Sequence, residues 1–260
     1  MTIPELALFL IIVGVGSYVQ AVTGFAMGMI IVAGTAVFSL MSLPTVTAVI
    51  SLVTFVNALL SLRGHYREVH GKLFVVVVIG QIPAIALGIQ LLDYLDAQAE
   101  LALSFLLGLF IVGGSLSMAL RPQPRPRVSG VPAMFAAGAF SGVLGGMFAA
   151  SAPILGWFTY RQPLPVAAIR ATLLSCFAMS TFTRNVLVGA QGGVTLDVLT
   201  LAALGLPLVI VGSWLGREFP IVRGEYSMRR FAFSLTLVLG LWILGDAGYE
   251  TFRSIQSTSQ

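Results

Sequence analysis

Gly80-Gln-Ile-Pro-Ala-Ile-Ala-Leu-Gly88 has an echo later in the chain, Leu204-Gly-Leu-Pro-Leu-Val-Ile-Val-Gly212. The proline and the final glycine of the two stretches align at one shared offset. Two internal copies that face opposite ways across a membrane are typical of transporters. The pair therefore predicts a membrane protein built from a repeat.

Further echoes flank this pair on both sides. Leu43-Pro44 and the apolar run after it parallel Leu164-Pro165 and its run. Later, Gly108-Leu-Phe-Ile-Val-Gly113 parallels Gly240-Leu-Trp-Ile-Leu-Gly245. The repeat therefore extends over both halves of the chain.

The amino-acid composition indicates that the folded chain lies in a lipid bilayer. Of its 260 residues 57% are hydrophobic and 9% charged, with a mean hydropathy of +0.97, whereas a soluble domain has roughly a quarter of its residues charged. Backbone groups in a lipid bilayer must pair within a segment or a closed barrel, and continuous apolar runs favour helices. We expect an all-α polytopic membrane protein with no nucleic-acid partner and, with Cys176 as its single cysteine, no internal disulfide.

Eight apolar stretches can be distinguished. Two of them, 4–41 and 131–159, do not match the length of one span, and both have glycines near the middle. The other six approach the roughly 20 residues that cross the hydrocarbon: about 43–62, 73–92, 101–120, 171–190, 195–216 and 228–249.

Charge supplies the orientation. Cytoplasmic loops are enriched in Lys and Arg, so we expect the basic loops inside. The loop at 93–100 is acidic and lies between two of them in the sequence, so we expect it on the opposite side. The stretch from Arg127 to Arg217 begins and ends inside but contains three apolar segments, so one of them must turn back. Arg161 and Arg170 mark the end of 131–159 as cytoplasmic, and this segment is therefore expected to enter the membrane and return. The basic loops contain Arg63, Arg67 and Lys72, then Arg121, Arg125 and Arg127, then Arg217, Arg223, Arg229 and Arg230.

These patterns predict two inverted repeats, each a glycine-broken hairpin followed by three transmembrane helices, about eight membrane segments in total. Residues 1–120 form the first repeat, 121–130 a proline-rich cytoplasmic linker and 131–260 the second repeat. Both termini then lie outside. Eight ordinary spans are the alternative, and they also keep both termini on one side.

A glycine-rich signature opens each half. The second copy reads Gly138-Ala-Phe-Ser-Gly-Val-Leu-Gly-Gly146 and is followed by Ala152-Pro-Ile-Leu155; the first reads Gln20-Ala-Val-Thr-Gly-Phe-Ala-Met-Gly28. On these motifs the whole chain resembles the sulfite exporter TauE/SafE family of bacterial four-plus-four-helix anion transporters. The resemblance implies a cargo of sulfite, organosulfonate or carboxylate. The first copy departs from the family pattern at Ala26 and Met27 and lacks the later proline.

Residues near the expected breaks are candidates for binding an anion. Broken helices direct free backbone N–H groups and positive dipole ends toward a substrate, and glycine allows close approach. Helix packing is the alternative role, because small and polar residues also occur at helix crossings. The substrate-binding candidates are Gln20, Thr23, Gly24, Gly28, Ser141, Gly145, Gly146, Ser151, Arg170 and Arg184.

Other polar residues carry different expectations. Arg184 lies in an apolar run near its outer end, and an intramembrane charge is a functional candidate; Arg170 is also explained as an anchor at the cytoplasmic surface. Asn57, Gln81 and Asn185 are expected to hydrogen-bond between helices. No role is assigned to either histidine.

Together these features predict a secondary transporter of the bacterial inner membrane that exports a small anionic substrate by alternating access. A coupling ion, either a proton or sodium, and a homo-oligomer are compatible with the sequence, which indicates no cofactor or metal. An anion channel or uniporter is the alternative function. An intramembrane enzyme is disfavoured, because Ser141 would need a base and neither histidine lies in a span.

Overall fold

The computed structural model describes residues 1–260 except 24–26, 120–123, 220–233, 235 and 250–260. The described part is helical and contains no strand, as expected of an all-α protein. Its elements are α1 (Ile3–Thr23), α2 (Met27–Val37), α3 (Leu43–Leu62), the 3-10 helix η1 (Tyr66–Glu68), α4 (Gly71–Gln98), α5 (Glu100–Ala119), α6 (Val131–Phe148), α7 (Ala152–Tyr160), α8 (Val166–Ala190) and α9 (Leu196–Glu218), and a further helix spans Thr236–Tyr249.

Six of the described helices are long and apolar enough to cross a membrane: α1, α3, α4, α6, α8 and α9. Shorter apolar helices are α2, Leu101–Leu116 within α5, and Thr236–Tyr249. Large apolar side chains such as Leu87, Phe140 and Trp214 are exposed on the outside of the bundle, where lipid tails would cover them. The chain is therefore a polytopic membrane protein, as predicted.

α6 and α7 form a hairpin. The backbone N–H of Arg125 donates to the carbonyl of Arg161 at 2.7 Å, and that of Ser129 donates to Oε1 of Gln162 at 2.9 Å. These bonds join the chain before α6 to the chain after α7. Both ends of the hairpin therefore lie at one end of the molecule.

The turn of this hairpin is not where the glycines predicted it. We expected the helix to break at Gly145 and Gly146, but α6 continues through both to Phe148. The chain turns at Ala149, whose φ of 51° is left-handed. In the first hairpin Gly28 is the second residue of α2, and Gly24 lies outside the described residues.

The glycines of α6 serve close packing against α4 instead. A Cβ on Gly138 would meet the carbonyl of Val77, and one on Gly146 would meet that of Ile85. Across the contact, a Cβ on Gly88 would meet the carbonyl of Val143. Small residues let membrane helices approach backbone to backbone, which is why α4 and α6 make the most extensive contact among the described helices.

α1 and α9 repeat this arrangement. A Cβ on Gly212 would lie 2.8 Å from the carbonyl oxygen of Gly14, and one on Gly216 would lie 2.7 Å from that of Tyr18. Thus α4 of the first half packs on α6 of the second, and α9 of the second half packs on α1 of the first, while α3 and α8 pack together between these pairs.

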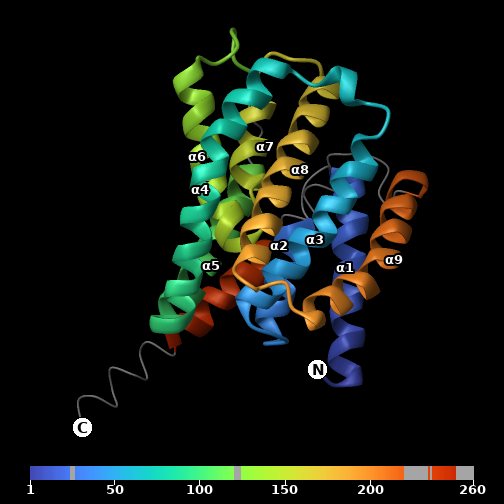
Figure 1. The fold of residues 1–260 in the computed structure, drawn as a ribbon, viewed down its shortest axis with the longest axis vertical. Coiled ribbons are helices and arrows are strands. Elements are labelled where there is room, and N and C mark those ends of the chain that lie inside the picture. Colours follow the sequence, from blue (N-terminus) through green and yellow to red (C-terminus); the bar gives the residue numbers. More distant parts are fainter. Residues whose placement is uncertain (24–26, 120–123, 220–233, 235, 250–260) are drawn as a thin grey trace.

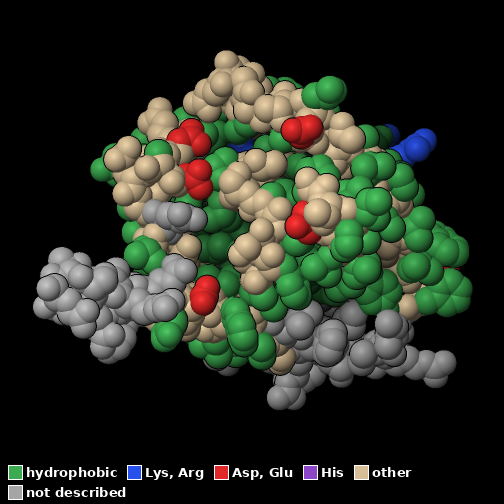
Figure 2. Space-filling model, turned by 90° about the horizontal axis from the view of Figure 1, so that it is seen from below, with side chains coloured by type: hydrophobic (Ala, Val, Ile, Leu, Met, Phe, Trp, Pro, Cys, Tyr) green, Lys and Arg blue, Asp and Glu red, His purple; other side chains and the backbone are tan. Residues whose placement is uncertain are grey.

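Acidic side chains gather at one end of the bundle. In Figure 1 the segment with η1 and the start of α6 lie at the top, whereas the N-terminus and the C-terminal ends of α4 and α8 lie toward the bottom. Figure 2, seen from below, shows Asp and Glu side chains over this face and few Lys or Arg side chains. Acidic and basic side chains are thus separated, as the sequence predicted for the acidic loop at 93–100.

Candidate functional site

Two cavities open in the described part of the bundle. The upper cavity, of about 450 Å³, is lined by residues of α1, α3, α7, α8 and α9 and by the segment around η1. The lower cavity, of about 300 Å³, is lined by residues of α3, α4, α8 and α9. We name them by their place in Figure 1.

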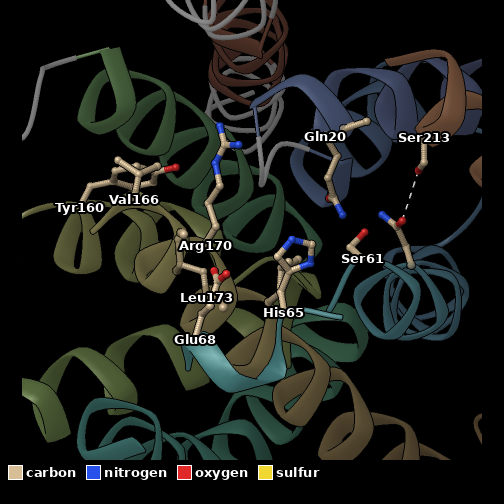
Figure 3. Close-up of a pocket in the computed structure, with 14 residues that line it drawn as sticks. Gln20, Ser61, His65, Glu68, Tyr160, Val166, Arg170, Leu173 and Ser213 are labelled. Carbon is tan, nitrogen blue, oxygen red and sulfur yellow. Dashed lines mark hydrogen bonds between the residues drawn. The ribbon is translucent and has the colours of Figure 1, made fainter. Parts of the chain in front are cut away.

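One wall of the upper cavity consists of uncharged polar side chains. Oε1 of Gln20 accepts a hydrogen bond from the backbone N–H of Met27, at 3.2 Å. Oδ1 of Asn57 accepts from Oγ of Ser213, also at 3.2 Å, and Nδ2 of Asn57 lies 3.9 Å from Sδ of Met27. Ser61 lies beside them (Figure 3).

The facing wall carries charge. Arg170 of α8 lies there with Glu68 of η1 and Tyr160 of α7, and His65 lies between the two walls (Figure 3). The guanidinium of Arg170 supplies positive charge for a small oxyanion, and the amides and hydroxyls of the other wall supply direction, whereas the carboxylate of Glu68 offsets part of that charge.

The lower cavity contains Arg184 and Asp93. Arg184 is only 2% exposed. Its Nε donates to the carbonyl of Gly146 at 3.0 Å, Nη1 to the carbonyl of Thr47 at 2.9 Å, and Nη2 to Oγ1 of Thr47 at 2.7 Å. The side chain therefore joins α8 to both α3 and α6.

Helix ends explain one of these bonds. α6 ends at Phe148, so the carbonyl of Gly146 belongs to the last turn and has no partner within the helix. A cation is favourable at the negative end of the helix dipole. Arg184 thus satisfies the end of α6, and these three bonds use three of its five N–H groups.

The hairpin residues lie away from both cavity linings. Oγ of Ser141 donates to the carbonyl of Gly138 at 2.9 Å and accepts from Nε2 of Gln81 at 3.4 Å. A Cβ on Gly145 would lie 3.1 Å from Oγ of Ser180 and 3.3 Å from Cβ of Ser151. Gly145 and Ser151 therefore meet at the tip of the second hairpin.

The ten candidates are accordingly distributed over the molecule. Gln20 and Arg170 meet at the upper cavity, and Arg184 lies at the lower one. Gly28, Gly145, Gly146, Ser141 and Ser151 belong to the hairpins, and Gly28 approaches the turn of the other hairpin, since its Cβ would lie 3.2 Å from the carbonyl oxygen of Ala149. The side chain of Thr23, like Gly24, is outside the described part.

The three interhelical hydrogen bonds predicted from sequence are confirmed: Asn57 pairs with Ser213, Gln81 with Ser141, and Asn185 with the carbonyl of Ser51. The cavity role of Asn57, Ser213 and His65 was missed. A polar side chain within an apolar helix was the available signal for the first two. Nothing in the sequence places His65 opposite Gln20.

Comparisons with known proteins match most of the chain, including the residues that line both cavities. The model of the family described as sulfite exporter TauE/SafE matches residues 8–243. A probable sulfite/organosulfonate exporter TauE from Cupriavidus necator is 36% identical over 229 residues, which are 88% of this chain and 90% of that protein. No solved structure matches the chain.

Proposed function

The chain belongs to the sulfite exporter TauE/SafE family, and from this premise we propose that it carries sulfite or an organosulfonate out of the cell by alternating access. The family consists of membrane exporters and not enzymes, and six or more apolar helices suit a multi-pass protein of the inner membrane. The cargo, the direction and the mechanism are our proposal.

The pair of cavities is the observation that carries the proposal. Each cavity holds an arginine, Arg170 in the upper and Arg184 in the lower, and the two open among the same helices, α3, α8 and α9. A carrier exposes its substrate to one side at a time. Two separate cavities favour a carrier over a channel, which needs a continuous passage.

Contacts between α3 and α8 would have to change during such a cycle. Oγ of Ser51 donates to the carbonyl of Thr181 at 3.3 Å, Nδ2 of Asn185 donates to the carbonyl of Ser51 at 3.4 Å, and Arg184 binds Thr47. Side-chain hydrogen bonds between membrane helices contribute about 0.6 kcal/mol on average. Such an interface can rearrange more readily than the glycine contacts of α4 with α6.

We propose that residues 1–120 and 131–260 are inverted repeats joined by a cytoplasmic linker at 121–130. In support, α4 and α9 each contain an interior proline, Pro83 and Pro207, and each packs glycines against the opposite half. With the basic loops in the cytoplasm, the upper cavity faces the cytoplasm, where an exporter loads its substrate.

Within this proposal, Gln20, Arg170 and Arg184 contact the substrate. Gly28, Ser141, Gly145, Gly146 and Ser151 shape the hairpins, and Thr23 and Gly24 stay candidates for substrate contact from the sequence alone. Either a proton or sodium is the coupling ion.

Counterflow in proteoliposomes tests the proposal. Vesicles loaded with unlabelled sulfite should accumulate external ³⁵S-sulfite transiently and saturably, because a carrier exchanges substrate across the membrane. A channel would equilibrate label without acceleration by internal sulfite. No flux of sulfite, methanesulfonate or taurine above that of empty vesicles would refute the function.

A further inference from the structure

We propose that Gln20 and Asn57 form a donor pole in the upper cavity, which favours oxyanions that carry no proton, and that Ser213 fixes this pole by orienting Asn57. The inference deepens the proposed function and rests on it. It concerns the selectivity of the site toward the head group of the substrate.

The orientation of Asn57 is determined by its neighbour on α9. The hydroxyl of Ser213 has one proton, which it donates to Oδ1 of Asn57. The amide nitrogen must then point the other way. Its contact in the described part of the chain is Sδ of Met27 at 3.9 Å, a weak acceptor, so the N–H groups of this 3% exposed side chain are available to the cavity.

Gln20 is oriented in the same manner. Its Oε1 accepts from Met27 N, which is the first residue of α2 and has no partner within the helix. Among the described residues Gln20 Nε2 has no acceptor, and Figure 3 shows the amide directed toward the space between Ser61 and His65. Since Gln20 and Asn57 both contact Met27, their amides lie on one side of the cavity.

Each amide oxygen thus already accepts one hydrogen bond, and the amide nitrogens are the groups directed at a ligand. Such a pole can donate to the oxygens of a sulfonate or of the sulfite dianion. The amide nitrogens cannot accept a hydrogen bond from an oxyanion that carries an O–H group, such as dihydrogen phosphate, whose hydroxyl would lose its hydrogen bond to water there. The opposite wall holds Arg170, which attracts all of these anions, and the acceptor Glu68; we assign the discrimination to the head-group oxygens that face the amide wall.

The discrimination can be measured by calorimetric titration of the full chain in detergent, with methanesulfonate and inorganic phosphate at mildly acidic pH. Wild-type protein should bind methanesulfonate at least tenfold more tightly than phosphate. Asn57→Asp replaces the donors by a carboxylate and should weaken methanesulfonate binding at least tenfold. Ser213→Ala frees the amide of Asn57 to turn and should reduce the discrimination severalfold, with Ser213→Thr restoring it.

Gln162→Glu is the matched control, because it changes a buried, hydrogen-bonded amide that lines neither cavity; it should leave the binding ratio per folded molecule unchanged. Two results would overturn the pole while the transport function stands: equal binding of both anions by wild type, or an unchanged ratio in Ser213→Ala. The second readout holds even where Asn57→Asp does not fold. A wild-type protein that binds neither sulfite nor methanesulfonate would instead refute the proposed function.

Discussion

Arg184 has the largest side chain among the fully buried residues of the described part. A guanidinium loses much hydration energy in the interior, and it is tolerated where its donors are satisfied. Here Gly146 and Thr47 supply the acceptors. Arg184 therefore holds α3, α6 and α8 together, whether or not it also contacts an anion.

Arg184→Gln should lower the free energy of unfolding by roughly 2–4 kcal/mol, because the carbonyls of Gly146 and Thr47 lose charged donors in a dry environment. Thermal denaturation in detergent measures the loss. Thr47→Val is the graded control, since it removes one acceptor and should have a smaller effect. A melting temperature equal to that of wild type would show that the three bonds do not hold the helices together.

Arg170 offers the contrasting case at the same scale. Its side chain is exposed at the upper cavity, so Arg170→Gln should leave the melting temperature near that of wild type. Methanesulfonate affinity should fall about tenfold, as expected for one lost charge-assisted hydrogen bond. Unaltered affinity in titrations of the purified variant would assign Arg170 to the surface anchor role alone.

The role of a single residue could be predicted from the sequence when any hydrogen-bond partner on a neighbouring helix would satisfy it. An amide within an apolar helix requires some interhelical partner, and Asn57, Gln81 and Asn185 all have one. The surroundings of Arg184 were beyond reach, because its partners lie 38 and 137 residues away. No local pattern encodes which carbonyls will be left unpaired beside it.

At the scale of elements, the hairpin was predicted and its turn was misplaced. Glycine destabilises a helix in water by about 1 kcal/mol relative to alanine, which suggested a break at Gly145 and Gly146. In lipid the same residue allows another helix to approach, and α6 continues because α4 packs on it. The turn falls at Ala149, a position without a glycine to indicate it.

Gly146→Ala should therefore act through packing. The new Cβ would meet the carbonyl of Ile85, and overpacking of this kind destabilises by about 1–3 kcal/mol. Size-exclusion yield and thermal denaturation should both fall. Gly14→Ala is the control, since nothing lies within 4 Å of its Cβ, and an equal effect of both variants would argue against the α4–α6 contact as the cause.

At the scale of the molecule, the charge pattern predicted that the acidic loop at 93–100 lies apart from the basic loops, and Figure 2 shows few Lys or Arg side chains on the acidic face. Periodicity could not reveal that α4 packs on α6 and α9 on α1, since those pairings depend on glycines far apart in the chain. The spans themselves were found well: 43–62 coincides with α3, while α4 and α8 extend beyond 73–92 and 171–190.

Orientation in the membrane is testable in whole cells. Cys176 is buried, and its replacement by alanine gives a background without cysteine. In that background Gln98→Cys, at the lower end, should react with a membrane-impermeant maleimide. Arg67→Cys, at the upper end, should react only after the inner membrane is opened. The reverse pattern would place the upper cavity outside and make uptake the natural direction.

The exchange of helices between halves has a consequence for biosynthesis. The ribosome delivers α1 first and α9 about 170 residues later, a delay of roughly 10–35 s at bacterial elongation rates. During that interval the surface of α1 around Gly14 and Tyr18, which α9 will cover, faces lipid or an insertion chaperone. The nascent first half therefore lacks a packing partner for α1. A chain whose synthesis stalls after residue 130 should be degraded by proteases.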